Sequence, residues 1–408
     1  MTRVLFVEAS TGGVVGGSLS GLYHLIRGMD RQRFPVGIAL YEPKQIENDL
    51  RALNVPIYHI QRPRLRKDHA LLGYDGYHRA KSIGAVRKSL RAGRHTVRLL
   101  AEEMPATRDL VRVIRRERPD VVHLGNGVRA NFDGILACLL TRTPIVCHVK
   151  GFEKYGARER WASRRMGTMV CMTRAVLDYC REHGLAPHDA RVVYDAIDEA
   201  WLQPTRSANE IRGELGLPAD ATCLGILGNV QEWKGQRVLV DAMEQVTRRR
   251  PNAHCLIVGG VHRAGEVYAD ELRRRVGQLG LSERVHFLGF REDVPDIINA
   301  LDVVVHASVR PEPFGRVILE GMLLGKPVVA TKAGGVLELI EHNKTGYLVP
   351  PGDTSALADC LITILAQPER AAAMGREARE WARNQFSLAR QVEEMGQIYE
   401  RSTRTNGS

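Results

Sequence analysis

Two glutamates separated by seven residues are the residues of this chain whose types and spacing most clearly suit a functional site. Glu312 is followed by the turn-forming sequence Pro313-Phe314-Gly315, and Glu320 lies beyond it in residues with a helical pattern. A helix that begins after a strand offers free N–H groups and a positive dipole end. Carboxylates placed there can accept hydrogen bonds from hydroxyl groups, such as those of a sugar. A helix cap with a solvated glutamate is the simpler alternative for the pair taken alone.

Lys234 is a candidate ligand for phosphate groups. It follows a predicted strand at 222–227 and stands directly before Gly235 and a predicted helix start, with Asn229 in the same loop. A lysine in this position can form a charge-assisted hydrogen bond with a diphosphate, worth about 1.5–3 kcal/mol. A surface lysine without a ligand is the alternative.

The first half of the chain contains a glycine-rich turn and a histidine that could also belong to a ligand-binding site. Gly12, Gly13, Gly16 and Gly17 follow the first predicted strand, where glycines let the backbone approach a ligand and a helix start favours an anion. Their spacing does not match the Gly-x-Gly-x-x-Gly dinucleotide fingerprint, and a tight turn would explain them equally. His148 ends a predicted strand, which would direct it toward a ligand cleft, although a structural histidine is also consistent.

Length and composition indicate a globular protein of two domains. The 408 residues exceed one ordinary core, and 44% of them are hydrophobic and 26% charged. No apolar run is long enough to span a membrane, and the first residues have the pattern of a strand and not of a signal peptide. The seven cysteines are scattered without a Cys-x-x-Cys pair, which predicts free thiols, a cytoplasmic location and no metal site.

Positive charge is concentrated in one stretch of the sequence. The formal net charge is +11, and residues 62–118 contain 16 Lys or Arg against 6 Asp or Glu, a difference of +10. Such a patch attracts a phosphate-bearing substrate, an anionic membrane surface or nucleic acid. Within it, the basic and partly apolar segment 61–104 could lie on a membrane or pack as a helix against its own domain, and periodicity does not decide between these.

Short apolar strands alternate with amphipathic helices along the chain, and the pattern occurs twice. This alternation is typical of a doubly wound parallel sheet, so the predicted class is α/β with two facing Rossmann-like domains and a C-terminal helix. The expected boundaries are 1–200, 201–385 and a helical segment at 386–408 that returns toward the first domain. Ligands of such domains bind at the carboxyl ends of the strands.

These motifs together resemble glycosyltransferase family 4, the retaining nucleotide-sugar transferases with the GT-B fold, of the type that builds exopolysaccharides and cell envelopes. The resemblance covers nearly the whole chain. Its elements are Gly12-Gly13, His148 after its strand, Lys234-Gly235, Phe287-Leu288-Gly289-Phe290 and the block from Ser308 to Asp353.

The resemblance implies roles for most of these residues. Glu320 would accept hydrogen bonds from the ribose of the donor nucleotide, and Glu312 from the donor sugar. His148, Lys234 and Glu312 would be catalytic, with His148 approaching the sugar from the first domain. The other implied contacts are Asn229 near the diphosphate, Phe290 beside the base, the Phe314 and Gly315 N–H groups near the sugar and phosphate, and Gly12, Gly13, Gly16 and Gly17 on the acceptor and phosphate side.

Two positions depart from the family pattern. Many members carry arginine where Asn229 stands, so a second cation at the diphosphate is not assured, although the Asn229 amide could donate a neutral hydrogen bond. Asp195-Ala196 replaces the Asn-Gly often found there, and no implied catalytic role involves these two residues.

The expected activity is transfer of a sugar from a nucleoside diphosphate, with a UDP-sugar favoured over GDP-mannose, to an anionic, lipid-linked saccharide in polysaccharide biosynthesis. The resemblance implies that no metal or other cofactor is needed. Location at the inner membrane face would follow from the basic patch, and no nucleic acid is expected as a partner. There are four alternatives: a transferase with a soluble acceptor, a nucleotide-sugar epimerase of the same fold, a nucleic-acid-binding protein and a non-catalytic carbohydrate-binding protein. The base, the sugar, the linkage and the oligomeric state are not indicated.

Overall fold

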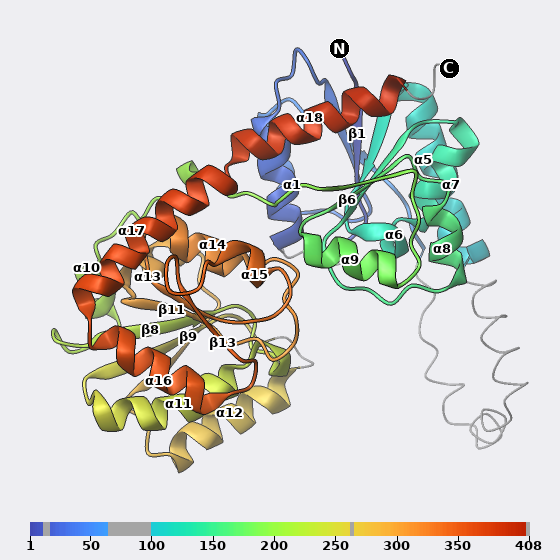
Figure 1. The fold of residues 1–408 in the computed structure, drawn as a ribbon. Coiled ribbons are helices and arrows are strands. Elements are labelled where there is room, and N and C mark those ends of the chain that lie inside the picture. Colours follow the sequence, from blue (N-terminus) through green and yellow to red (C-terminus); the bar gives the residue numbers. More distant parts are fainter. Residues whose placement is uncertain (11–16, 64–98, 262–264, 405–408) are drawn as a thin grey trace, which may run out of the picture. The chain divides into compact units, whose positions relative to one another are not determined.

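The computed structural model describes residues 1–10, 17–63, 99–261 and 265–404. These residues form two compact units. Unit 1 contains Met1–Cys171, Leu177–Val193 and the C-terminal residues from Val392, and unit 2 contains Met172–Val176 and Tyr194–Gln391. Each unit is built on its own parallel sheet (Figure 1).

The sheet of unit 1 has seven strands in the order β3-β2-β1-β4-β5-β6-β7, and every neighbouring pair is parallel. The central strands are buried along their whole length, as expected for a parallel sheet covered on both faces. The strands are β1 (Val4–Glu8), β2 (Val36–Leu40), β3 (Ile57–His59), β4 (Val121–Leu124), β5 (Ile145–Val149), β6 (Thr168–Cys171) and β7 (Asp189–Val192).

Helices lie on both faces of this sheet (Figure 1). The last of them, α18 (Leu388–Arg404), contributes Tyr399, which is fully buried and whose hydroxyl lies 2.7 Å from Nδ1 of His123 on β4. The others are α1 (Gly17–Gly28), α2 (Glu47–Ala52), the π-helix η2 (Leu99–Glu103), α5 (Met104–Glu117), α6 (Gly127–Ala130), α7 (Phe132–Thr141), α8 (Ala157–Ser163) and α9 (Arg174–Glu182), whose first residues belong to unit 2.

The sheet of unit 2 has six parallel strands in the order β10-β9-β8-β11-β12-β13. Its chain order reverses between β8 and β11, which are neighbours, and ligands of doubly wound sheets bind at such a switch point. The strands are β8 (Thr222–Leu227), β9 (Ala253–Val258), β10 (Val285–Gly289), β11 (Val303–His306), β12 (Val328–Thr331) and β13 (Tyr347–Val349).

Two layers of helices cover this second sheet (Figure 1). Together the two sheets confirm the predicted class, an α/β protein with two Rossmann-like parallel sheets. The helices of unit 2 are η3 (Glu199–Trp201), α10 (Ala208–Glu214), η4 (Glu232–Lys234), α11 (Gln236–Arg249), α12 (Glu266–Gln278), α13 (Val294–Ala300), α14 (Arg316–Leu323), α15 (Val336–Leu339), α16 (Thr354–Leu365) and α17 (Pro368–Gln385).

Gly235 brings the loop after β8 into contact with the loop after β11. Its φ angle is 72°, and a Cβ atom added there would lie 1.9 Å from the carbonyl oxygen of Ala307. Only glycine permits both this backbone conformation and this approach. The contact fixes the position of the preceding residue, Lys234.

We predict that Gly235→Ala destabilises unit 2 by clearly more than the roughly 1–2 kcal/mol that a left-handed non-glycine residue costs by itself. Gly216→Ala is the matched control, because Gly216 also has a positive φ, 63°, but has open space where the Cβ would lie. Urea unfolding of both variants measures the difference. Equal losses of stability would show that the contact with Ala307 is not tight.

Candidate active site

The loops that follow β8 and β11 meet at the switch point of unit 2. The Val309 N–H donates to the carbonyl oxygen of Trp233 at 2.8 Å, which joins the two loops through their backbones. Lys234 and Glu312, 78 residues apart in the sequence, form an ion pair with 2.7 Å between Nζ and Oε2. The two residues predicted to act on the diphosphate and on the sugar are therefore neighbours.

Glu312 is a buried carboxylate with three donors on one oxygen. Its side chain is 12% exposed, and besides Lys234 its Oε2 lies 3.3 Å from Nε2 of His306 and 3.2 Å from the Ser308 hydroxyl. Burial by itself would raise the pKa of Glu312, but the hydrogen bond from His306 and the charge of Lys234 outweigh it and lower the pKa to about 2. Glu312 is thus ionised at every pH at which a protein normally works.

The backbone of Glu312 is held by the loop after β12. The Gly335 N–H donates to the carbonyl oxygen of Glu312 at 2.8 Å. Gly334 has a φ of 65°, and a Cβ atom there would lie 2.4 Å from the same carbonyl oxygen. The Gly334-Gly335 pair therefore permits a close backbone approach that fixes the direction of the carboxylate.

Glu320 lies on α14, which begins directly after Gly315. Its side chain is 14% exposed, and its Oε1 is 3.7 Å from the Arg316 guanidinium. Burial raises the pKa of Glu320, and the positive charge of Arg316 counters part of this effect. Phe314 is buried and packs edge-on against Phe386, which anchors the start of the helix.

Phe290 and Asn229 stand at the edge of the same site. Phe290 follows β10 and is 67% exposed, and its Cβ lies 3.7 Å from where a Cβ of Gly260, after β9, would be. Asn229, after β8, is exposed, and its carbonyl oxygen accepts a hydrogen bond from Gln236. Loops after β8, β9 and β10 therefore come together where the resemblance implies the nucleotide base.

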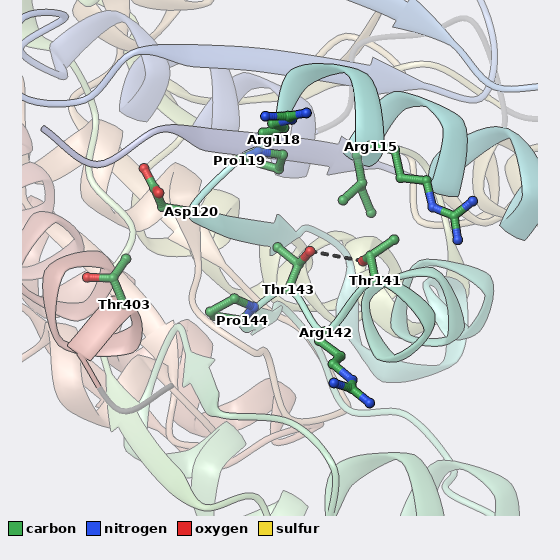
Figure 2. Close-up of a pocket in the computed structure, with 10 residues that line it drawn as sticks. Arg115, Arg118, Pro119, Asp120, Thr141, Arg142, Thr143, Pro144 and Thr403 are labelled. Atoms are coloured by element: carbon green, nitrogen blue, oxygen red, sulfur yellow. Dashed lines mark hydrogen bonds between the residues drawn. The ribbon is translucent and has the colours of Figure 1, made fainter. Parts of the chain in front are cut away.

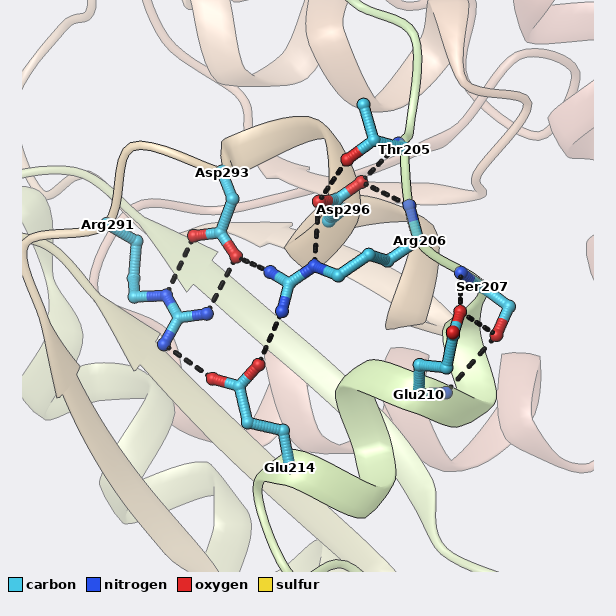
Figure 3. Close-up of polar contacts among 8 residues, drawn as sticks. All are labelled: Thr205, Arg206, Ser207, Glu210, Glu214, Arg291, Asp293 and Asp296. Atoms are coloured by element: carbon cyan, nitrogen blue, oxygen red, sulfur yellow. Dashed lines mark hydrogen bonds and ion pairs between the residues drawn. The ribbon is translucent and has the colours of Figure 1, made fainter.

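An ion-pair network holds the loop that presents Phe290 (Figure 3). Arg291 binds Asp293 at 2.7 Å and Glu214 at 2.9 Å, and the second oxygen of Glu214 accepts from Arg206 at 2.6 Å. Arg206 also binds Asp293 and, at 3.1 Å, Asp296. Bidentate arginine pairs are directional, so the network restricts the loop after β10 and the segment that leads into α10.

The predicted residues of unit 1 are only partly described. Gly12, Gly13 and Gly16 lie outside the described residues, and Gly17 is the first residue of α1. His148 lies within β5 and is fully buried. Its ring centroid is 5.4 Å from that of His123, and neither of its ring nitrogens has a hydrogen-bond partner among the described residues. Burial, and secondarily the charge of Lys150, lower the pKa of His148 well below its ordinary value, so its ring is neutral.

Most of the basic stretch at 62–118 also lies outside the described residues. Of its described members, Arg62 is 3.6 Å from the buried carboxylate of Asp133. Arg115 and Arg118 line a separate pocket with Arg142 (Figure 2), beside residues that precede β4 and β5. None of the predicted site residues lines this pocket, because it lies where strands begin and not where they end.

Three residues of the site were not found from the sequence. His306 and Ser308 contact Glu312 Oε2, and Thr331 lies behind the histidine, with its Oγ1 3.3 Å from Nδ1 of His306. His306 and Thr331 are polar residues that end two neighbouring strands, β11 and β12, and this position was the available signal.

No group of three or more His, Cys, Asp or Glu side chains in the described part of the chain is arranged to hold a metal ion. Among the same residues, no helix is long and apolar enough to cross a membrane. That no metal or other cofactor is needed stays a prediction.

Comparisons with known families agree with this geometry. Residues 15–201 match the family described as Glycosyltransferase Family 4, and residues 207–381 match glycosyl transferases group 1. The chain is 31% identical over 271 residues to the lipopolysaccharide core biosynthesis mannosyltransferase LpcC of Rhizobium leguminosarum, covering 65% of this chain and 74% of that protein. It is also 33% identical over 233 residues to the D-inositol 3-phosphate glycosyltransferase of Corynebacterium efficiens. That match covers 55% of this chain and 54% of that protein, so the chain spans about half the length of this relative.

Solved structures extend the likeness to the whole chain. Anabaena HepE, crystallised with UDP and glucose, has a TM-score of 0.80 and 25% identity, covering 98% of this chain and all of that one (100%). WaaG, a glycosyltransferase of lipopolysaccharide biosynthesis, shares the fold with a TM-score of 0.68 at 16% identity, covering 97% of this chain and 99% of that one. The fold is that of a GT-B glycosyltransferase, and the chain belongs to glycosyltransferase family 4, a family of transferase enzymes.

The lowered pKa of Glu312 predicts a specific dependence of stability on pH. An acid whose pKa falls from 4.5 to about 2 on folding stabilises the fold above pH 4.5, and this contribution is lost as the pH falls toward 2. Wild type should therefore exceed Glu312→Gln in unfolding free energy by up to roughly 3 kcal/mol at neutral pH, and the gap should narrow below pH 4.5.

Denaturant unfolding across this pH range measures the gap. Glu341→Gln is the control, because the Glu341 carboxylate pairs with Lys344 at the surface, where an ion pair contributes little to stability. A gap for Glu312→Gln that does not change with pH would refute the buried ion pair.

Proposed function

We propose that the protein is a retaining glycosyltransferase that takes its sugar from a nucleoside diphosphate, with a UDP-sugar favoured over GDP-mannose. The observation that carries the proposal is the meeting of Lys234 and Glu312 at the switch point, with Glu320 on the adjoining helix. A cation for phosphate and carboxylates for hydroxyls are what a sugar nucleotide requires. The crystal structures of HepE with UDP and with UDP-glucose support a UDP-sugar as the donor.

In this proposal the donor lies across the carboxyl ends of β8 and β11. Lys234 binds the diphosphate, Glu320 accepts the ribose hydroxyls, and Glu312 accepts hydroxyls of the sugar. The base lies beside Phe290, and the N–H groups of Phe314 and Gly315 lie near the sugar and phosphate. The low exposure of both glutamates favours this use, because hydrogen bonds to a buried carboxylate are stronger than those made in water.

The chemical step breaks the bond between the sugar and the leaving phosphate through a state with oxocarbenium character. Charge develops on the departing diphosphate, so the main contribution of the enzyme is electrostatic stabilisation by Lys234 and the backbone N–H groups at the start of α14. The leaving phosphate takes the proton of the acceptor hydroxyl on the same face of the sugar, which retains the anomeric configuration. His148, in unit 1, acts at the sugar, and no metal is required.

The acceptor in this proposal is an anionic, lipid-linked saccharide of polysaccharide biosynthesis. The basic stretch at 62–118 supports an anionic acceptor, and so do the names of relatives, which include inositol 3-phosphate and L-malate as well as lipopolysaccharide core. The lipid-linked form, and contact with the inner membrane face, rest on the basic stretch and on the lipopolysaccharide enzymes.

Lys234→Ala tests the role of the lysine in turnover. Removing the lysine takes one hydrogen-bond donor away from the negative charge that develops on the leaving diphosphate, and this should lower kcat by about 100- to 1000-fold. The assay follows UDP released from UDP-sugars, with and without acceptor, after a thermal-shift panel of nucleoside diphosphates has chosen the base. At about 100 times Kd a ligand stabilises the fold by about 2.7 kcal/mol, which such a panel detects.

Lys344→Ala is the control, because Lys344 is an exposed lysine of the same unit that binds only Glu341 among the described residues. A fully active Lys234→Ala would remove the lysine from the mechanism. Formation of an epimer of the donor without release of UDP would favour the epimerase alternative.

Glu320→Gln separates the binding role of Glu320 from its effect on stability. Because burial raises its pKa, the ionised form of Glu320 costs folding free energy above its ordinary pKa, so the neutral variant should be at least as stable at neutral pH. UDP binding should weaken by about 10- to 100-fold through lost charged hydrogen bonds to the ribose. Calorimetry measures Kd, and an unchanged Kd would exclude the ribose contact.

A further inference from the structure

His306 occupies a central position in the donor site that no role above explains. It is the last residue of β11, its ring is buried, and it lies between two hydroxyl groups and the carboxylate of Glu312. The protons available to these partners determine the protonation of the ring. The proton of each hydrogen bond can be assigned in turn, because carbonyl and carboxylate oxygens only accept hydrogen bonds and a hydroxyl group donates one.

The Nδ1 side of the ring faces Thr331. The Thr331 hydroxyl lies 2.9 Å from the carbonyl oxygen of Ser308, to which it must give its single proton. Its oxygen can therefore only accept from Nδ1 of His306, at 3.3 Å. Nδ1 carries a proton in this arrangement.

The Nε2 side of the ring faces Ser308 and Glu312. The Ser308 hydroxyl donates to Glu312 Oε2 at 3.2 Å, so its oxygen accepts from Nε2 at 3.0 Å. Glu312 Oε2, at 3.3 Å, is an acceptor as well. If Ser308 instead donated to the ring, its oxygen would face the ionised carboxylate with no proton between them. Nε2 therefore also carries a proton.

Both ring nitrogens donate, and the groups around the ring are consistent with a positive charge. The titratable groups that face it are Glu312 and, through Glu312, Lys234. The strands on either side contribute the uncharged residues Ile226 of β8 and Ala330 and Thr331 of β12. The only acidic group that an interaction of the described residues places against His306 is Glu312.

We propose that His306 is a positioning residue, a doubly protonated imidazole that acts as the fixed counter-ion of Glu312 and so allows Lys234 to leave Glu312 for the diphosphate of the donor. A buried carboxylate that loses its partner is strongly destabilised. In the free protein Lys234 is bound to Glu312, and the proposed function requires it to bind phosphate instead. His306 keeps the carboxylate compensated during this exchange.

The protonation state can be tested without any assay of activity. Protein labelled with ¹⁵N-histidine gives a ring signal for His306, assigned by its absence in His306→Gln. The proposal predicts a ring with both nitrogens protonated at neutral pH in the free protein, and a shift toward the neutral form in Thr331→Val, which removes the acceptor of Nδ1–H. A neutral His306 ring in the wild-type protein at neutral pH would overturn the proposal.

The positioning role has a separate kinetic readout and rests on the proposed function. The value of kcat/KM should fall as the pH rises through the titration of His306, because the active form is protonated, and His306→Gln should lose this step together with about 10- to 100-fold in kcat/KM. Glu312 does not produce the step, since its pKa of about 2 lies far below the working range.

His254→Gln is the matched control. His254 is as buried as His306 and bonds through both ring nitrogens, to His286 and Arg284, but lies near the start of β9 and away from the donor site. It should retain the pH step. A retained step in His306→Gln would overturn the positioning role, whereas an absence of sugar transfer in wild type would instead reject the proposed function and leave the NMR result unaffected.

Discussion

The negative charge of Glu312 is the feature on which the rest of the donor site depends. A buried carboxylate is tolerated only where donors replace the water it has lost, and here Lys234, His306 and Ser308 supply them to a single oxygen. Each donor is held by a different constraint of the fold. Gly235 allows the loop that carries Lys234 to pack closely against Ala307, and His306 is the last residue of the buried strand β11. The geometry of the site is therefore a direct product of where the strands of unit 2 end.

The crowding of hydrogen-bond donors on one oxygen of Glu312 has a consequence for substrate binding in the proposed function. In the proposed function Lys234 binds the diphosphate of the sugar nucleotide, and it cannot bind Glu312 and the diphosphate with full strength at once, so the ion pair of the free protein must be exchanged. A buried charge left alone would oppose this exchange, and a second fixed cation removes the opposition. The site is thus best described as a carboxylate with one permanent and one transferable partner.

The sequence predicted the fold and the strand-end positions of Lys234 and Glu312 because both depend on local patterns. Alternating apolar strands and helices, with Lys234 and Glu312 after two of the strands, were enough to place both residues at strand ends. The sequence could not show that β8 and β11 are neighbours, and this pairing brings the two residues to 2.7 Å. His306 was missed for the same reason, since its partner Thr331 ends the next strand of the sheet.

His148 belongs to unit 1. The expected strand ended at His148, and β5 spans Ile145–Val149, so His148 is its penultimate residue and is fully buried beside His123. Its ring nitrogens have no partner among the described residues, so its place in the chemistry rests on family resemblance and not on a contact. Membership of family 4 fixes the class of the enzyme, while the relatives are named for different acceptors.

A crystal structure of the protein with an intact UDP-sugar tests the central claim most directly. The account predicts that Lys234 Nζ moves from Glu312 to the diphosphate, that Glu320 binds the ribose hydroxyls, and that Glu312 keeps its hydrogen bond to His306 while it accepts a sugar hydroxyl. A nucleotide bound at the switch point with Lys234 still paired to Glu312, or bound elsewhere, would contradict it.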